Sequence, residues 1–434
     1  MATRLQDLLG KGDRYALAGD PERARKAYRQ AVKQAPADAL ALSRLIDLEM
    51  RTGNQKAAVP LLRKLTSVRS GEPAIRLKLA AALEDSGDAA EAEKELRNLV
   101  AETPGLAEAH NNLGNLLIVK QAYEEALSAY DAALALNPGV AASWINAGNV
   151  LDELGRPADA LERYAKAIEI QPSLAEAHYF RARARTALGE EAAALADVEE
   201  CLRRDPADQK GLALKGVLLT ALGREDEARA LFDYDRFMRP MTVEPPQGYA
   251  SLVEFNAAVI DHIRKRVKLE YNPYGVSTRG GYHSRNLLRD PHPTMQALRA
   301  MLQTVFSEYV AGLPQDDAHP FLRRKHSRVR LVAQAQLLES QGYLSSHIHP
   351  GGWVSSAYYL QVPEVVSDDA DRPGWLEFGR PTEEIKTSTG LELRAIRPEP
   401  GRAVLFPSYF FHGTRPFESS EPRISLGVDL IAQD

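Results

Sequence analysis

The sequence predicts two domains of different class: an all-α array of repeated helix pairs, followed by a mostly β domain with supporting helices. Small residues recur every 34 positions through the first half of the 434-residue chain. This repeat ends near Pro240, and from about residue 328 the hydrophobic period changes from helical to alternating, as in a strand. We therefore expect seven repeat units over 1–240, a linker over 241–250 and a second domain over 251–434.

The repeat is most regular at one position, which is alanine in all seven units: Ala24, Ala58, Ala92, Ala126, Ala160, Ala194 and Ala228. A glycine position is interrupted once, by Gln121: Gly19, Gly53, Gly87, Gly155, Gly189 and Gly223. A proline position is interrupted once, by Ser70: Pro36, Pro104, Pro138, Pro172, Pro206 and Pro240. Alanine lets two helices approach closely, glycine suits the turn between them, and proline begins the break between units.

This period and these residue types resemble the tetratricopeptide repeat over about residues 3–240. The resemblance implies a superhelix of antiparallel helix pairs whose concave face binds peptides or proteins.

Two pairs of asparagines, Asn112 with Asn146 and Asn115 with Asn149, are spaced by 34 on the first helices of their units. The stretch 107–115 resembles repeats of O-GlcNAc transferase, in which an asparagine ladder binds an extended peptide. An amide side chain both donates and accepts, as a peptide unit does. The alternative is that these asparagines are solvated side chains on a helix face.

The second domain begins with two amphipathic segments, 251–268 and 294–313, which we expect to be helices. Alternating patterns then predict short strands from about 328 and at 353–362, 374–379, 391–397, 402–406 and 423–431. Short strands separated by glycine and proline favour an all-β sandwich or jelly roll, with its core at about 328–431.

Three of the ten histidines stand out by their surroundings. His347 and His349 lie two apart before a proline, so on an extended chain both project from the same face and are placed to bind one ion. His412 follows the apolar segment 403–406, and Arg423 and Ser425 open the last strand.

These segments resemble the Fe(II)/2-oxoglutarate-dependent oxygenases, and in particular a subfamily with a His-x-His-Pro pattern. The matching pieces are His347-x-His349 with the strand 355–363, the segment 398–408 with His412, and Arg423-x-Ser425. The resemblance implies a double-stranded β-helix (jelly roll), Fe(II), 2-oxoglutarate as cosubstrate, and O₂. It also implies that the metal histidines are catalytic.

The same resemblance implies that Arg423 binds the far carboxylate of the cosubstrate. Ser425 and Tyr359 are the expected further partners of the cosubstrate.

One position departs from the common pattern of two histidines and one carboxylate. His349 stands where the acid is expected. We favour His349 as a third imidazole ligand, as in the resembled subfamily. The alternatives are that His347 and His412 hold the metal with water in the third place, or that Glu377 is a distant acidic substitute.

The expected function is hydroxylation of a protein or peptide side chain that the repeats recruit. A competing interpretation is a small-molecule hydroxylase whose repeats serve docking or oligomerisation. A second is a scaffold protein whose jelly roll is not catalytic.

The composition limits the partners and the compartment. A net charge of −5 and a pI near 6.1 give no electrostatic reason to expect nucleic acid. The single cysteine, Cys201, excludes a disulfide framework and indicates a reducing compartment. No run approaches the ~18 apolar residues of a membrane span. We therefore expect a cytoplasmic protein without a membrane partner.

Overall fold

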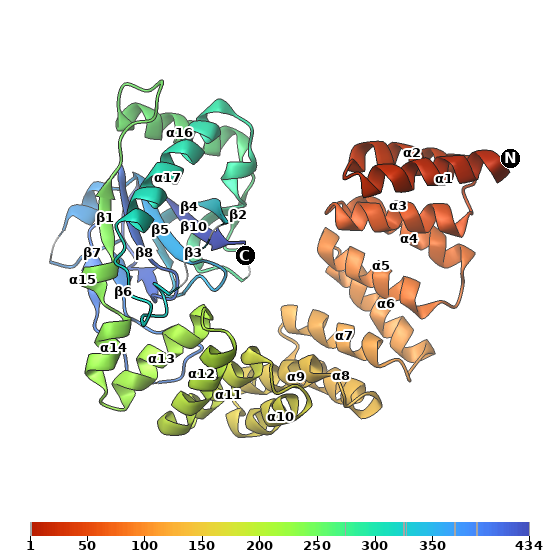
Figure 1. Ribbon diagram of the computed structural model, residues 1–434, viewed down its shortest axis with the longest axis horizontal. Coiled ribbons are helices and arrows are strands. Elements are labelled where there is room, and N and C mark those ends of the chain that lie inside the picture. The colour runs from red at the N-terminus through yellow and green to blue at the C-terminus, as the bar shows by residue number, and fades with distance from the viewer. Residues whose placement is uncertain are drawn as a thin grey trace. The chain divides into compact units, whose positions relative to one another are not determined.

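The computed structural model describes residues 2–273, 275–323, 326, 328–368, 370–387 and 389–433. The chain divides into two compact units, Met1–Pro172 and Ser173–Asp434. The first holds helix pairs of the repeat, and the second holds the last two pairs together with the strands (Figure 1). In the described part of the chain, no helix is both long and apolar enough to cross a membrane.

The repeat consists of consecutive helix pairs, one pair to each 34-residue unit. The first compact unit contains α1 (Ala2–Leu17), α2 (Pro21–Gln34), α3 (Ala39–Arg51), α4 (Gln55–Val68), α5 (Pro73–Ser86), α6 (Ala89–Glu102), α7 (Ala107–Val119), α8 (Tyr123–Leu136), α9 (Ala141–Glu153) and α10 (Pro157–Ile170). The second begins with α11 (Ala175–Ala187), α12 (Glu191–Arg204), α13 (Gln209–Ala221) and α14 (Glu225–Leu231). The predicted tetratricopeptide pairs are therefore present, and the last one has a short second helix.

The turn between the two helices of a unit explains the glycine series. The glycines of this series have φ between 71° and 93°, in the left-handed region that favours glycine. Gln121, the exception in the sequence, has a φ of 58° and adopts the same region. The turn geometry is therefore kept in the fourth unit, at the conformational cost that a side chain brings there.

A second repeated contact joins the two helices of a unit, where an aromatic ring of the second helix lies over a glycine of the first. A Cβ atom on Gly148 would lie 2.5 Å from the ring of Tyr164, and one on Gly114 would lie 2.8 Å from that of Tyr130. Gly216 and Phe232 repeat the contact in the last unit. Glycine is needed here because the ring fills the space of a side chain.

The strands of the second compact unit form a jelly roll. Within the described residues, a large antiparallel sheet has the order β1-β8-β5-β10-β4-β3-β2 and a small one the order β7-β6-β9. The strands are β1 (Arg239–Thr242), β2 (Leu269–Tyr271), β3 (Thr278–Ser284), β4 (Val329–Leu344), β5 (Val354–Gln361), β6 (Leu376–Phe378), β7 (Arg394–Ile396), β8 (Arg402–Pro407), β9 (His412–Thr414) and β10 (Arg423–Ala432). The sheets meet in an apolar core, where the rings of Phe378 and Phe406 lie 4.9 Å apart.

The supporting helices agree with the sequence prediction to within about two residues: α16 (Leu252–Arg266) packs against β5, and α17 (Pro293–Ala311) packs beside α16. The hydroxyl of Tyr358 donates to Asn256 Oδ1 at 2.7 Å and ties β5 to α16. Shorter helical segments are α15 (Tyr234–Phe237), η1 (Leu287–Arg289) and η2 (Glu364–Ser367).

The predicted linker needs one correction. Met241 and Thr242, its first two residues, belong to β1 and pair with Ala403 and Arg402 of β8. The composition of residues 241–248 predicts a linker, but the edge of the sheet at β8 offers hydrogen-bond partners to the backbone at its start.

The last repeat packs directly on the jelly roll within the second compact unit. Phe232 stacks on Phe410 with ring centroids 5.0 Å apart, and the hydroxyl of Tyr409 donates to the carbonyl of Leu231 at 2.6 Å. Phe410 lies two residues before His412. The segment that carries His412 is therefore held from behind by the end of the repeat.

We predict that Gln121→Gly stabilises the protein by about 0.5–1 kcal/mol, because it removes a side chain from a left-handed position. Gly155→Ala, at the equivalent turn of the next unit, should destabilise it by about 1 kcal/mol. Urea unfolding followed by the helical circular dichroism signal measures both effects. Two shifts in the same direction would contradict this account of the turn.

Candidate metal centre

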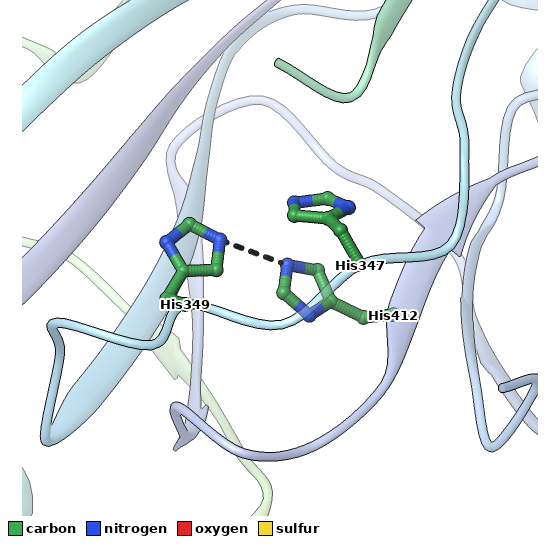
Figure 2. A group of neighbouring side chains, drawn as sticks. All are labelled: His347, His349 and His412. Carbon is green, nitrogen blue, oxygen red and sulfur yellow. Dashed lines mark hydrogen bonds between the residues drawn. The ribbon is translucent and has the colours of Figure 1, made fainter. Parts of the chain in front are cut away.

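Three histidines from two segments far apart in the sequence converge in the jelly roll (Figure 2). His347, His349 and His412 each offer a ring nitrogen, and these nitrogens all lie within 4.8 Å of one another. The Nε2 atoms of His349 and His412 are 3.2 Å apart. His412 is buried, whereas His347 and His349 are half-buried.

Backbone hydrogen bonds place the three side chains. The amide of His347 donates to the carbonyl of His412 at 2.9 Å, and the amide of His412 donates back at 3.0 Å. The amide of His349 donates to the carbonyl of Ser408 at 2.9 Å. The two segments are therefore paired like short strands, and side chains two residues apart face the same partner segment.

The outward nitrogens of His347 and His412 both face backbone carbonyls. His347 Nδ1 lies 2.8 Å from the carbonyl of Ser345, and His412 Nδ1 lies 2.9 Å from that of Phe410. A carbonyl only accepts, so each Nδ1 carries the proton. The inward Nε2 of each ring then presents a lone pair, which is the form that binds metals.

At His349, a carboxylate is the hydrogen-bond partner of Nδ1, in place of a backbone carbonyl. Its Nδ1 lies 2.8 Å from Oδ2 of Asp429 on β10. Ser355 donates to the other carboxylate oxygen at 2.7 Å, and the Ser355 and Ser408 hydroxyls lie 2.8 Å apart. The Nε2 of His349 is thereby turned toward the other two histidines.

The electrostatics favour neutral imidazoles at two of the three positions. Burial lowers the pKa of His347 to about 3 and that of His412 well below its ordinary value. Burial also opposes the charged form of His349, but the Asp429 carboxylate outweighs it and raises the pKa of His349. Burial likewise opposes the charged form of Asp429, but His349 outweighs it and lowers the pKa of Asp429.

This arrangement fits a divalent cation. The Nε2 atoms of His349 and His412 lie 3.2 Å apart, close enough to share one positively charged centre, either a proton or a metal ion. Nitrogens bound to one ion at adjacent octahedral positions lie about 3 Å apart, given N–metal distances of about 2.0–2.2 Å. One pair of nitrogens has this spacing and all three lie within 4.8 Å of one another, so the three histidines offer the donor atoms for one face of such a site.

Glu377, the distant acidic alternative, is engaged elsewhere. Its carboxylate accepts from Arg380 at 3.0 Å and from Arg415 at 2.9 Å. These arginines outweigh burial and lower the pKa of Glu377. The structure places Glu377 in an ion-pair cluster and not among the three histidines.

A buried guanidinium lies on the inner face of the large sheet. Arg423 is 1% exposed, and its Nε and Nη1 have no hydrogen-bond partner among the described residues. The Tyr359 ring lies 5.1 Å from the guanidinium, and its hydroxyl also lacks a partner in the described part of the chain. A buried, unpaired charge is costly, so these donors together form a site suited to an anion.

Ser425, the third predicted cosubstrate residue, is already hydrogen bonded. Its hydroxyl donates to Gln336 Oε1 at 3.3 Å, and Ser425 is the register partner of both Gln336 and Tyr359. It shares the inner face with Arg423, two residues away on β10.

The four predicted peptide-binding asparagines divide into two groups. Asn115 accepts from Tyr130 at 2.6 Å and Asn149 accepts from Tyr164 at 2.9 Å, so both help to hold the ring-on-glycine contacts. Asn146 donates to Asn115 at 3.1 Å. Asn112 has no hydrogen-bond partner among the described residues, and its role in peptide binding stays a prediction.

Two residues of this region are not among the sequence-predicted ones: Asp429, which contacts His349, and Gln336, which contacts Ser425. The signal for Asp429 was present: it lies an even number of residues after Arg423 and Ser425 in an otherwise apolar strand, so it shares their face. Gln336 lies on the face of β4 that carries polar side chains, and this face is the inside of the jelly roll, where Gln336 is 7% exposed. We find no sequence signal for Ser277, whose hydroxyl lies 3.4 Å from His347 Nε2.

Comparison with protein families supports the prediction for each half of the chain. Residues 335–429 match the family model described as "Putative 2OG-Fe(II) oxygenase". Residues 105–173 match one tetratricopeptide repeat model, and residues 9–73 and 145–208 match another. The chain therefore carries tetratricopeptide repeats followed by a domain of the 2OG-Fe(II) oxygenase kind. None of the curated proteins matches the chain.

Several solved structures are similar to part of the chain. A tetratricopeptide repeat protein from Parabacteroides merdae is 20% identical, with a TM-score of 0.44, over 53% of this chain and 91% of its own. The C-terminal part of a repeat-containing protein from Cytophaga hutchinsonii is 13% identical, with a TM-score of 0.44, over 51% and 92%. YrrB, described as a TPR protein with an unusual peptide-binding site, is 24% identical, with a TM-score of 0.33, over 38% and 85%.

We predict that the metal-free protein loses stability as the pH falls from about 6.5 toward about 3. The folded chain keeps His347 neutral, because burial lowers its pKa to about 3, and burial lowers the pKa of His412 as well. The unfolded chain takes up protons on both near pH 6.5, so the free energy of unfolding drops by up to ~1.4 kcal/mol per pH unit for each histidine. His349 affects stability in a different pH range. Because its pKa is raised in the folded protein, its contribution to the free energy of unfolding is fully present below pH ~6.5 and is lost at higher pH.

Urea unfolding at pH 7, 6 and 5 with a chelator present measures this dependence. The His347→Gln variant is the control and should show a shallower slope over the same range. An equal slope in both proteins would show that His347 does not titrate as the structure indicates.

Proposed function

We propose that this protein is an Fe(II)- and 2-oxoglutarate-dependent dioxygenase that hydroxylates a protein or peptide side chain recruited by its repeats. The observation that carries this proposal is the convergence of three inward-facing imidazole nitrogens inside a domain that matches the 2OG-Fe(II) oxygenase family model.

The metal ligands in this proposal are His347, His349 and His412. Each ring has its Nδ1 engaged by an acceptor, which leaves the Nε2 lone pairs for Fe(II). A metal held by these three histidines would keep coordination positions for a cosubstrate and O₂. His349 thus takes the place that a carboxylate has in the common triad.

Arg423 is the proposed anchor for the far carboxylate of 2-oxoglutarate. Its buried guanidinium has Nε and Nη1 without partners, and a carboxylate matches two N–H groups of a guanidinium at once. The unpaired hydroxyl of Tyr359 and the hydroxyl of Ser425 lie on the same sheet face and would complete the contacts. A dicarboxylic oxo acid satisfies both the metal and this pocket.

Fe(II) with 2-oxoglutarate and O₂ supplies an oxidation coupled to loss of CO₂, with succinate as coproduct and a hydroxyl group added to unactivated carbon. The protein side chains bind and orient these groups and take little part in bond making. The apolar surroundings of His412, which include Phe378 and Phe406, keep bulk water from that side of the centre.

The substrate class rests on the repeats. Tetratricopeptide arrays present extended surfaces for peptides and proteins. Asn112 lies on α7 and is half-buried, and in this proposal its amide binds the peptide backbone. A protein or peptide side chain is therefore the substrate that best explains why these repeats precede an oxygenase domain.

We predict uncoupled turnover of 2-oxoglutarate by the purified full-length protein supplied with Fe(II) and O₂. Succinate formation, followed by mass spectrometry, is the measurement. His412→Ala should abolish it, because two imidazoles hold the ion poorly. Arg423→Ala should raise the 2-oxoglutarate requirement about 10–150-fold, since losing a charge-assisted contact costs ~1.5–3 kcal/mol.

Glu377→Gln is the control, because Glu377 lies in a separate ion-pair cluster and should leave the 2-oxoglutarate titration unchanged. An unaltered titration in Arg423→Ala would remove Arg423 from the proposed pocket. Full activity in His349→Ala would favour the two-histidine site.

We predict that the first compact unit is needed for substrate and not for uncoupled turnover. A chain of residues 173–434 keeps the last two helix pairs, and with them the Phe232–Phe410 stack. It should form succinate at the normal uncoupled rate, which also shows that it is folded. The full-length His347→Ala variant serves to capture the protein substrate. The short chain should hydroxylate this substrate poorly, and mass spectrometry detects the products by their added 16 Da.

Equal hydroxylation by the short and full-length chains would show that the first five repeats do not deliver the substrate. The small-molecule interpretation would then be the better one. In the full-length chain, Asn112→Ala should weaken substrate binding by about 2–10-fold, the loss of one hydrogen bond of ~0.5–1.5 kcal/mol.

A further inference from the structure

Among the residues that the structure describes, Asp429 is the acidic residue whose side chain contacts the histidine cluster. His349 Nδ1 lies 2.8 Å from Asp429 Oδ2 and 2.7 Å from Oδ1, so both carboxylate oxygens face the imidazole. The Asp429 side chain is 15% exposed and lies on β10 between the apolar residues Val428 and Leu430. Burying a carboxylate there is costly unless it has partners.

The partners of Asp429 form a closed ring of contacts that begins and ends at His349. The His349 ring contacts Asp429, which accepts from Ser355 at 2.7 Å. The Ser355 hydroxyl lies 2.8 Å from that of Ser408, and the carbonyl of Ser408 accepts from the His349 amide at 2.9 Å. Both the backbone and the ring of His349 are therefore held by the same small network.

Gly352 leaves the room that this network needs. A Cβ atom at this position would lie 2.4 Å from the Ser408 hydroxyl and 3.5 Å from Asp429 Oδ1. The amide of Gly352 donates to the carbonyl of His349 at 3.0 Å and closes the turn that follows the histidine. The local chain is thus shaped around the contact between His349 and Asp429.

The charge of the centre gives this contact a function. A dication bound by three neutral imidazoles keeps two positive charges, whereas a site with one carboxylate ligand keeps one. Asp429 supplies a negative charge next to His349 without occupying a coordination position. A carboxylate that accepts from the outer nitrogen of an imidazole also makes its inner nitrogen a stronger donor.

We propose that Asp429 is the positioning residue of the metal centre: it holds His349 with Nε2 toward the metal and provides, from behind this ligand, the negative charge that the missing acidic ligand would supply. This inference rests on the proposed function, because it takes the three histidines as the metal ligands. Asp429 acts through His349 and does not itself bind the ion.

The test is anaerobic titration of the full-length protein with Co(II), followed by its visible absorption and by calorimetry. Asp429→Asn keeps an acceptor atom but removes the charge, and it should weaken Co(II) binding about 10–100-fold. Asp429→Ala should weaken it further, and Ser355→Ala, which removes one support of the carboxylate, should have the mildest effect. Glu377→Gln is the matched control and should bind Co(II) like the wild type.

A spectroscopic readout separates positioning from a general loss of structure. Co(II) shifts the exchangeable Nδ1–H protons of bound histidines far downfield in the ¹H NMR spectrum, and the wild type should show one such signal for each of the three ligands. His349→Ala identifies the signal of His349. In Asp429→Ala this signal alone should broaden or vanish through exchange with water, because its acceptor is gone.

Wild-type Co(II) affinity in both Asp429 variants would overturn the proposal. So would loss of all Co(II) binding in Asp429→Asn together with retained binding in His349→Ala, because Asp429 would then be a direct ligand. If the wild type binds Co(II) with three shifted N–H signals but forms no succinate, the proposed oxygenase function fails and the role of Asp429 stands. If the wild type forms succinate but both Asp429 variants bind Co(II) normally, the proposed role of Asp429 fails and the proposed oxygenase function stands.

Discussion

The backbone pairing of His347 with His412 is the contact on which the rest of the centre depends. Two reciprocal hydrogen bonds join segments that lie 65 residues apart and fix two imidazoles side by side, with ring centroids 4.2 Å apart. Because His349 follows on the same short segment, a third nitrogen is brought to the same point. The acceptors at the three Nδ1 atoms then aim the Nε2 atoms inward.

The large sheet contributes to the site through one face of its central strand. Arg423 and Ser425 at the start of β10, and Asp429 near its end, alternate onto the inner face, where β4 and β5 add Gln336 and Tyr359. One strand thus carries both the anion-binding arginine and the carboxylate behind His349. A change in the register of β10 by one residue would move Arg423, Ser425 and Asp429 to the outer face of the sheet.

The repeats and the jelly roll do not meet at a flexible joint within the second compact unit. Phe232, Phe410 and Tyr409 form one aromatic cluster, and the strand β1 that follows the repeat joins the edge of the large sheet. The second compact unit begins at Ser173, after five of the seven helix pairs, although the periodic sequence continues to Pro240. Periodicity therefore marks the local helix pair and does not mark the boundary of the compact unit.

The sequence by itself determined the helix pairs, the strands β4, β5, β6, β7, β8 and β10 and the candidate histidines, because each depends on a pattern within a short segment, whereas β1, β2, β3 and β9 were not predicted. The 34-residue period, the alternation from residue 328 and the two-residue spacing of His347 and His349 are all local. Only the tertiary structure decided that Asp429 lies behind His349, that Gln336 points inward, and that Asn115 and Asn149 hold tyrosine hydroxyls. The physical reason is that a polar side chain takes its role from the partner it meets, and these partners come from other strands or helices.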